Sequence, residues 1–282
     1  MQEAFKVLTG FLDEQFIALL LTWPRIQAFL LASQILNPTA VPRLARTAAV
    51  LALSIHILPV NLDYAARFDR TVPSLALHFF KEFAIGFLLG TLIGWIFWVV
   101  QASAALIDNQ RGAAIASSVD PLHGHETSPL GILFAQAFLT YMFITGAVLP
   151  IIGILYQSYV AWPIDRGLPL FGAEFPRAML AIFDHSMRLM FLLAAPIVAV
   201  MFMAEFALAM VSRFAPQIQV FVLAMPIKSG LAIFMLIFYF SILLPYAAKE
   251  SERGRSYIQG FYSLLEGAWG VKPPAGPPEA PR

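Results

Sequence analysis

Four ionisable residues stand inside long apolar stretches of this sequence: Arg25, Arg188, Glu205 and Lys228. A charge at membrane depth needs a partner or water, so each such residue is a functional hypothesis in itself. Glu205 is a candidate partner for Lys228, and together they could form the midplane site of a secondary transporter of small solutes. The alternative is structural pairing, or side chains that reach the interface along their aliphatic stems.

A polar insertion at residues 107–121, IDNQRGAAIASSVDP, follows one of the most apolar stretches of the chain. Asp108 and Arg111 are three residues apart and pair if this part is helical, and Gly112 permits a turn. The small residues in the middle are unlike an ordinary charged loop. The insertion could fold back into a cavity and block it, since irregular backbone at membrane depth is tolerated only inside protein. A solvated loop is the alternative.

Glycines recur at every fourth position in GFLLGTLIG, and an acidic residue precedes them at the same spacing: Glu82, Gly86, Gly90 and Gly94. This spacing places all four on one helix face, where the backbone of a second helix can approach closely. The second helix could belong to the same chain, which is ordinary packing, or to a neighbouring subunit.

A short polar turn joins the last two apolar stretches, with Arg213, Pro216 and Gln217 in the turn and Pro226 and Lys228 just beyond it. We expect this turn to shape a terminal hairpin. His123 and His125 are two histidines in a loop, but no cysteine or dense carboxylate cluster accompanies them, so we expect an exposed loop and no metal site.

The sequence contains none of the common catalytic motifs: no phosphate-binding glycine loop, no GxSxG and no HExxH. Cysteine is absent, which excludes disulfides, thiolate nucleophiles and cysteine-ligated metals. We therefore expect a protein that is not an enzyme and carries no cofactor. A formal net charge of +1 gives no reason to expect nucleic acid as a partner.

The elements that carry these residues are apolar helices. Hydrophobic residues make up 59% of the 282 and charged residues only 12%, whereas a soluble domain has about a quarter charged. The sequence predicts an all-α membrane protein with about six long, partly kinked apolar helices arranged as hairpins within a larger helical assembly. The expected segments are 16–36, 44–60, 79–107, 129–157, 179–211 and 218–247.

Two of these segments are too long for a simple span. At 1.5 Å per residue, segment 179–211 would be about 50 Å long and segment 79–107 about 43 Å, against a hydrocarbon core of about 30 Å. Kinks at Pro24, Pro150, Pro196 or Pro245 could absorb part of the excess. Alternatively, part of each helix lies outside the bilayer against other apolar protein.

Six spans would place both chain ends on one side of the membrane. That side carries most basic residues of the connections, among them Arg67, Arg70 and Arg166, so we expect both termini in the cytoplasm. Residues 1–249 are predicted to form one integral membrane domain. Residues 250–282 are predicted to form a polar, Pro-rich cytoplasmic tail, partly disordered.

The run at residues 107–121 and the run RFAPQIQVFVLAMPIKSGL at residues 213–231 together resemble the SctT/FliR family. These proteins are export-apparatus subunits of type III secretion systems and of the flagellum. The glycine-spaced helix from Glu82 to Gly94 also fits, and the resemblance covers the chain to about Tyr262. The sequence from Asp108 to Gly112 is more similar to the injectisome branch than to the flagellar branch.

The resemblance implies a subunit of the bacterial inner membrane that joins SctR- and SctS-like proteins in a helical entry channel, with an SctU-like protein associated. Unfolded secreted proteins would pass through it. A plug loop would close the channel, formed here by Asp108, Asn109, Gln110, Arg111, Gly112, Ser117, Ser118, Asp120 and Pro121. The residues that would form helix-packing or subunit contacts are Glu82, Gly86, Gly90, Gly94, Arg213, Pro216, Gln217, Pro226 and Lys228.

Overall fold

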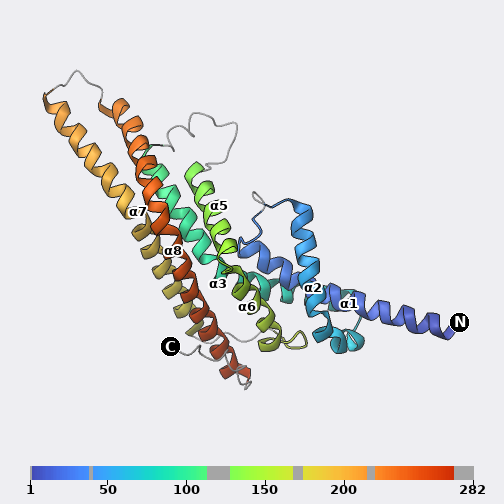
Figure 1. The fold of residues 1–282 in the computed structure, drawn as a ribbon. Helices are drawn as coiled ribbons and strands as arrows, with labels where there is room; N and C mark the ends of the chain where they lie inside the picture. The colour runs from blue at the N-terminus through green and yellow to red at the C-terminus, as the bar shows by residue number, and fades with distance from the viewer. Residues whose placement is uncertain (1, 38–40, 113–127, 168–173, 215–219, 270–282) are drawn as a thin grey trace, which may run out of the picture. The chain divides into compact units, whose positions relative to one another are not determined.

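The computed structural model describes residues 2–37, 41–112, 128–167, 174–214 and 220–269. Every regular element in these ranges is an α-helix (Figure 1). The helices are α1 (Gln2–Ala32), α2 (Arg43–Arg67), α3 (Val72–Gln110), α5 (Pro129–Ile144), α6 (Val148–Ala161), α7 (Glu174–Phe214) and α8 (Val220–Trp269). The all-α fold predicted from the sequence is confirmed.

The fourth predicted segment, 129–157, is not one helix, and the sequence prediction is wrong on this point. It breaks between α5 and α6 at Gly146, whose φ of +73° is the left-handed conformation that ends many helices. The Gly146 N–H donates to Phe143 O, which closes the last turn of α5. Pro150 does not cause the break, because it stands in the first turn of α6, where a missing N–H costs nothing.

Among the described residues, five helices are long and apolar enough to cross a membrane, and α5 with α6 can supply a sixth, broken span. This chain is a multi-pass membrane protein. The lengths of α7 and α8, 41 and 50 residues, correspond to about 60 and 75 Å. Both helices therefore exceed the hydrocarbon thickness of about 30 Å by a wide margin.

The chain divides into two compact units. The first unit comprises residues 1–94, 148–176 and 254–282. In it α1 packs against α2 and against the first half of α3. Ala18 and Leu21 of α1 and Ala65 of α2 form a buried apolar cluster there. His78 of α3 stacks on Tyr64 and meets Phe68 edge to face, which fixes the ends of α2 and α3 together.

The second unit comprises residues 95–147 and 177–253. Its interior holds edge-to-face aromatic pairs, Phe97 with Phe138 at 5.0 Å and Phe134 with Phe240 at 4.9 Å between ring centroids. These pairs join α3 and α8 to α5.

Helices α7 and α8 lie side by side as a long antiparallel hairpin in the second unit (Figure 1). Three contacts tie them along their length. Lys228 pairs with Glu205, the Tyr239 hydroxyl donates to Leu193 O, and His185 contacts Glu250 at 2.7 Å. Residue numbers fall along α7 as they rise along α8, which is the register of an antiparallel pair.

The helices differ in how much of their apolar surface the chain itself buries. In the most apolar window of α3, 67% of the residues are buried, against 28% in α7 and 22% in α8. Phe206 and Met203 on α7 and Ile237 on α8 are more than two-thirds exposed. The side chains of the hairpin therefore require lipid or other protein to cover them.

The polar tail is predicted to begin at residue 250. Helix α8 continues through this position and ends at Trp269. The tail is thus helical as far as Trp269, and residues 270–282 lie outside the described part of the chain. The boundary between a membrane domain and a tail stays a prediction.

Candidate functional site

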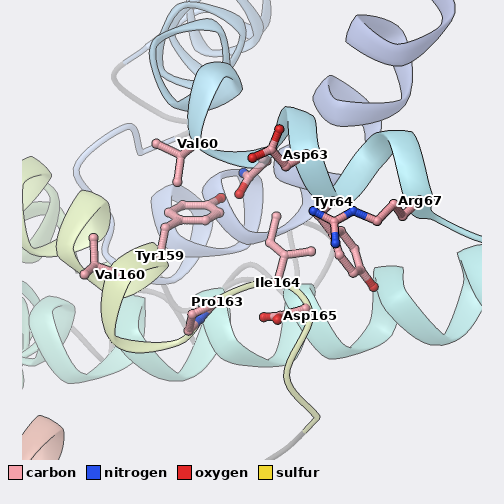
Figure 2. A pocket seen from close by; sticks show the side chains of 10 residues that line it. Val60, Asp63, Tyr64, Arg67, Tyr159, Val160, Pro163, Ile164 and Asp165 are labelled. Carbon is pink, nitrogen blue, oxygen red and sulfur yellow. The ribbon is translucent and has the colours of Figure 1, made fainter. Parts of the chain in front are cut away.

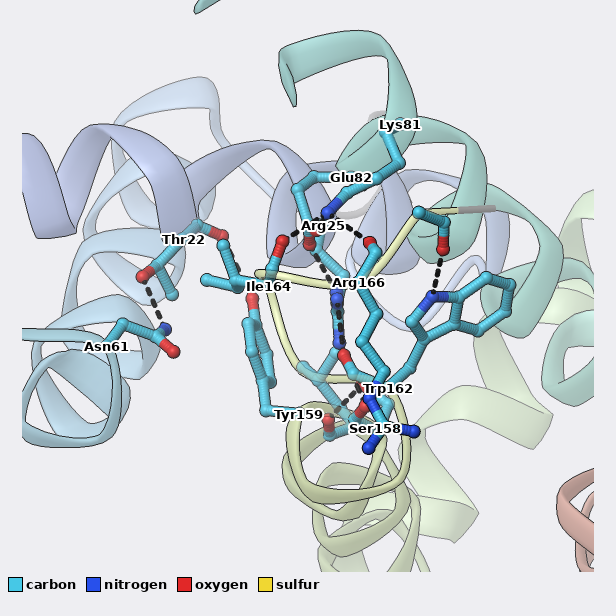
Figure 3. Close-up of polar contacts among 12 residues, drawn as sticks. Thr22, Arg25, Asn61, Lys81, Glu82, Ser158, Tyr159, Trp162, Ile164 and Arg166 are labelled. Atoms are coloured by element: carbon cyan, nitrogen blue, oxygen red, sulfur yellow. Dashed lines mark hydrogen bonds and ion pairs between the residues drawn. The ribbon is translucent and has the colours of Figure 1, made fainter. Parts of the chain in front are cut away.

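A buried cluster of charges lies in the first unit (Figure 3). Arg25 on α1 is fully buried, and its Nε donates to Glu82 Oε2 on α3 at 2.6 Å. Its two terminal nitrogens donate to Ser158 O and Trp162 O, both at 2.9 Å, at the end of α6. The guanidinium also lies 4.1 Å from the centroid of the Tyr159 ring.

Lys81 brings a second cation to the same carboxylate. Its Nζ lies 3.1 Å from Glu82 Oε1 without hydrogen-bond geometry, so this contact is electrostatic. The ammonium instead donates to Ile164 O and Arg166 O, the second at 2.9 Å, in the segment after α6. Arg25 therefore satisfies two carbonyls at the negative end of the α6 dipole, and Lys81 satisfies two more in the segment that follows α6.

This cluster joins three helices at one point in an apolar protein. Removing two charges from water is costly, and the pair is tolerated only when every donor finds a partner. Here the partners come from α1, α3 and α6, so the charges fix how the three helices meet. Arg25 and Glu82 each stand out in the sequence, but nothing in the sequence pairs them.

The glycines of α3 bring α1 into backbone contact. A Cβ added at Gly86 would lie 2.1 Å from Arg25 O, one at Gly90 2.5 Å from Phe29 O, and one at Gly94 2.7 Å from Ala32 O. The helix facing these glycines belongs to the same chain, which is the first of the two alternatives left open by their spacing. The close approach also brings Arg25 within reach of Glu82.

A second polar site, in the second unit, joins the two sides of the predicted plug segment. Asp108 is 2% exposed at the end of α3. Its Oδ2 accepts from the Ser128 hydroxyl and from the Leu130 N–H, the latter at 2.9 Å. Ser128 is also the N-cap of α5, since its Oγ accepts from the Gly131 N–H at 2.8 Å. The carboxylate thus connects the end of α3 to the positive start of α5.

The residues next to Asp108 complete the turn that ends α3. Arg111 Nε donates to Asp108 Oδ1 at 2.7 Å, the pair that the i, i+3 spacing predicts. Gly112 has a φ of +89° and its N–H donates to Asn109 O, so it makes the predicted turn. Gln110 is the last residue of α3. The remaining predicted plug residues, Ser117, Ser118, Asp120 and Pro121, lie outside the described residues, as do His123 and His125.

The terminal hairpin contains the third predicted set. Lys228 Nζ lies 3.4 Å from Glu205 Oε2, with the lysine side chain 11% exposed and the glutamate 50% exposed. Arg188 pairs with Asp184 on the surface of α7. Arg213 is exposed at the end of α7 and Pro226 lies inside α8. Pro216 and Gln217 lie outside the described residues.

Two functional contacts were missed from the sequence. Ser128 followed by Pro129 is a recognisable helix start, an N-cap with proline at the first helical position, so Ser128 could have been found. The Arg25–Glu82 pair spans 57 residues. Either Glu82 or Glu205 could pair with Arg25, and no local signal in the sequence chooses between them.

Residues 16–254 match the family model described as bacterial export proteins, family 1. The chain belongs to this family. The resemblance based on the two long sequence runs is therefore confirmed, and the protein is a membrane protein of bacterial protein export.

Individual relatives in this export family are similar over most of their length. Yop proteins translocation protein T of Yersinia pestis is 36% identical over 208 residues, which cover 73% of this chain and 78% of the relative. Surface presentation of antigens protein SpaR of Salmonella typhimurium is 32% identical, with 74% and 78% covered. Flagellar biosynthetic protein FliR of Bacillus subtilis is 30% identical, with 81% and 88% covered.

Proposed function

We propose that this protein is a non-enzymatic structural and gating subunit of a type III secretion export gate in the bacterial inner membrane. In this proposal it assembles with SctR- and SctS-like subunits into the entry channel for unfolded secreted proteins, with an SctU-like subunit associated. Membership of the export family and similarity to a Yop translocation protein support the type III assignment. Both termini would lie in the cytoplasm.

The gating role in this proposal rests on the Asp108 site. One buried carboxylate binds the end of α3 and the start of α5, so the two ends of the segment between residues 112 and 128 are held together. A segment anchored this firmly at both ends can act as a plug without displacing the helices that carry it. Arg111 and Gly112 would direct its first residues.

The exposed apolar surface of the α7–α8 hairpin supports the assembly part of the proposal. Its side chains are covered less by their own chain than those of α3, and helices of about 60 to 75 Å cannot be covered by lipid alone. Neighbouring subunits of an assembly that extends beyond the bilayer would cover them.

Purification in mild detergent tests the assembly. We expect the tagged chain to bring down SctR- and SctS-like subunits in fixed ratio. A chain that purifies alone as a stable monomer and binds a small solute would contradict the proposal and favour a transporter.

Deletion of residues 113–119 tests the plug. We expect the complex to assemble and the membrane to become more permeable to ions and small molecules, as measured by dye or ion uptake. A deletion of similar size in residues 270–282 is the matched control. An assembled complex with unchanged permeability would remove the plug from the proposal.

A further inference from the structure

The first unit contains a cavity of about 650 Å³ between the last two turns of α2 and the end of α6 (Figure 2). Its floor is built from three residues that are nearly inaccessible to solvent, Asn61, Tyr159 and Ile164. Two of them are held in place from behind, because the Asn61 amide donates to the Thr22 hydroxyl and the Tyr159 hydroxyl to Thr22 O. The floor is therefore rigid.

Three charged side chains stand at the exposed rim of this cavity: Asp63 and Arg67 from α2 and Asp165 from the segment after α6 (Figure 2). Among the residues that the structure describes, none of the three has a hydrogen bond or an ion pair. Asp63 and Arg67 are four residues apart on one helix face and still do not pair. Within the described part of the chain, the rim thus offers one guanidinium and two carboxylates without a hydrogen-bond or ion-pair partner, and Lys81 acts on Asp165 only electrostatically.

Apolar side chains of α2 and α6 line the part of the cavity that runs along these helices. Val60 on α2 and Val160 on α6 line it and are 63% and 58% exposed. Val60, Asp63, Tyr64 and Arg67 follow the i, i+3, i+4, i+7 pattern of one helix face. Seven residues along this face correspond to about 10 Å. The face therefore changes from apolar to charged within about 10 Å, slightly more than the polar headgroup layer of about 5–8 Å on each side of a bilayer.

We propose that this cavity binds the headgroup of a zwitterionic phospholipid with a primary ammonium, of the phosphatidylethanolamine type. The phosphate is bound by the Arg67 guanidinium, which suits planar, bidentate recognition of phosphate. The ammonium donates to Asp63 and Asp165, and an acyl chain lies along Val60 and Val160. Each free charge at the rim then has a partner of opposite sign.

Other ligands satisfy this site less well. An anionic headgroup such as phosphatidylglycerol brings no cation to either carboxylate, which leaves Asp63 without one and Asp165 with only the electrostatic interaction of Lys81. A choline headgroup has no N–H to donate to them. A basic side chain of a partner polypeptide would pair with the carboxylates but leave Arg67 without an anion. The mixture of free charges therefore favours a ligand that carries both signs.

Native mass spectrometry of the purified full-length chain, or of its complex, tests the lipid class. Delipidated protein is titrated with phosphatidylethanolamine, phosphatidylglycerol and phosphatidylcholine. We expect phosphatidylethanolamine to bind roughly tenfold more tightly than the other two, since one charge-assisted hydrogen bond accounts for about that factor. Equal binding of the three lipids would overturn the proposal.

Variants at the rim test the location. Arg67→Ala should weaken the binding of all three lipids, since each of them carries the phosphate. The double variant Asp63→Asn, Asp165→Asn should lose the preference for phosphatidylethanolamine. The matched controls Arg70→Ala and Asp69→Asn, at exposed positions outside the cavity, should keep it. Thermal stability of every variant is measured alongside, since rim substitutions should leave it unchanged. Preference retained in the double variant, or undiminished lipid binding in Arg67→Ala, would overturn the location.

A photo-crosslinking amino acid at Val160 distinguishes lipid from protein in the living membrane. We expect an adduct with phospholipid after irradiation. An adduct with another polypeptide would assign the cavity to a partner subunit, and the absence of any lipid adduct would likewise overturn the proposal. Because this readout does not depend on export, it can fail while the export function stands.

Discussion

At the level of single residues, the Glu82 carboxylate lies between two cations, Arg25 and Lys81. The N–H groups of Arg25 that do not face Glu82 donate to carbonyls at the end of α6. The cluster contains a buried ion pair, and the energetics of buried ion pairs apply to it. Its net contribution to stability is small, but the loss of one partner leaves a buried charge without compensation. Single substitutions there should therefore be severe.

Arg25→Ala is expected to destabilise the first unit by about 3–5 kcal/mol, because the Glu82 carboxylate and the α6 carbonyls lose their donors. Thermal unfolding in detergent, or the amount of protein in the membrane, measures this. The control is Arg188→Ala, whose pair with Asp184 is about three-quarters exposed and should contribute at most about 1 kcal/mol. Equal effects of the two substitutions would contradict the assignment.

Gly86→Ala is expected to separate α1 from α3, since the new Cβ would lie 2.1 Å from the Arg25 carbonyl oxygen and backbone cannot move aside locally. We expect a loss of at least about 2 kcal/mol, comparable to other overpacked interiors. Gly153→Ala on α6 is the matched control. A Cβ there meets nothing within 4 Å, and alanine is the better helix former by about 1 kcal/mol, so this variant should be neutral or more stable.

At the level of elements, Asp108 acts as a connection between α3 and α5 rather than as a surface charge. Asp108→Asn keeps an acceptor but loses the charge that Arg111 and the start of α5 stabilise. The Leu130 amide, which donates to Asp108, should exchange with deuterium about tenfold faster, as one charge-assisted hydrogen bond weakens by about 1.4 kcal/mol. Asp184→Asn, on the surface of α7, is the control. Unchanged exchange at Leu130 would show that the carboxylate does not hold α5.

The elements themselves could largely be predicted from the sequence. Long apolar runs gave the helices, and the Asp108–Arg111 pair and the Gly112 turn followed from local spacing. The break at Gly146 was missed, because a single glycine in an apolar run is compatible with a continuous membrane helix. The left-handed φ of Gly146 is selected by how the following helix packs, which the local sequence does not show. The Arg25–Glu82 pair was missed because it forms between residues far apart in sequence.

At the level of the whole molecule, the α7–α8 hairpin carries the apolar surface that the chain does not cover itself. Met203→Asp replaces a side chain that is 72% exposed on α7. We expect the variant to keep its own fold and to lose co-purifying subunits, because a charge is placed in a contact that excludes water. Leu193→Asp, at a position 1% exposed, should instead lower the amount of folded protein. The proposed assembly would be contradicted if Met203→Asp retained all partners.

The Arg25 cluster also has a consequence for biogenesis. When α1 leaves the ribosome, Glu82 is still 57 residues away and the Ser158 carbonyl 133 residues away. A lone arginine near a helix centre raises the free energy of insertion by about 2.5–3.5 kcal/mol, and α1 is the least apolar of the five unbroken spans. The first helix should therefore enter the bilayer only after the third has been made. A chain truncated before residue 72 should leave α1 accessible to protease, whereas the same truncation with Arg25→Leu should insert.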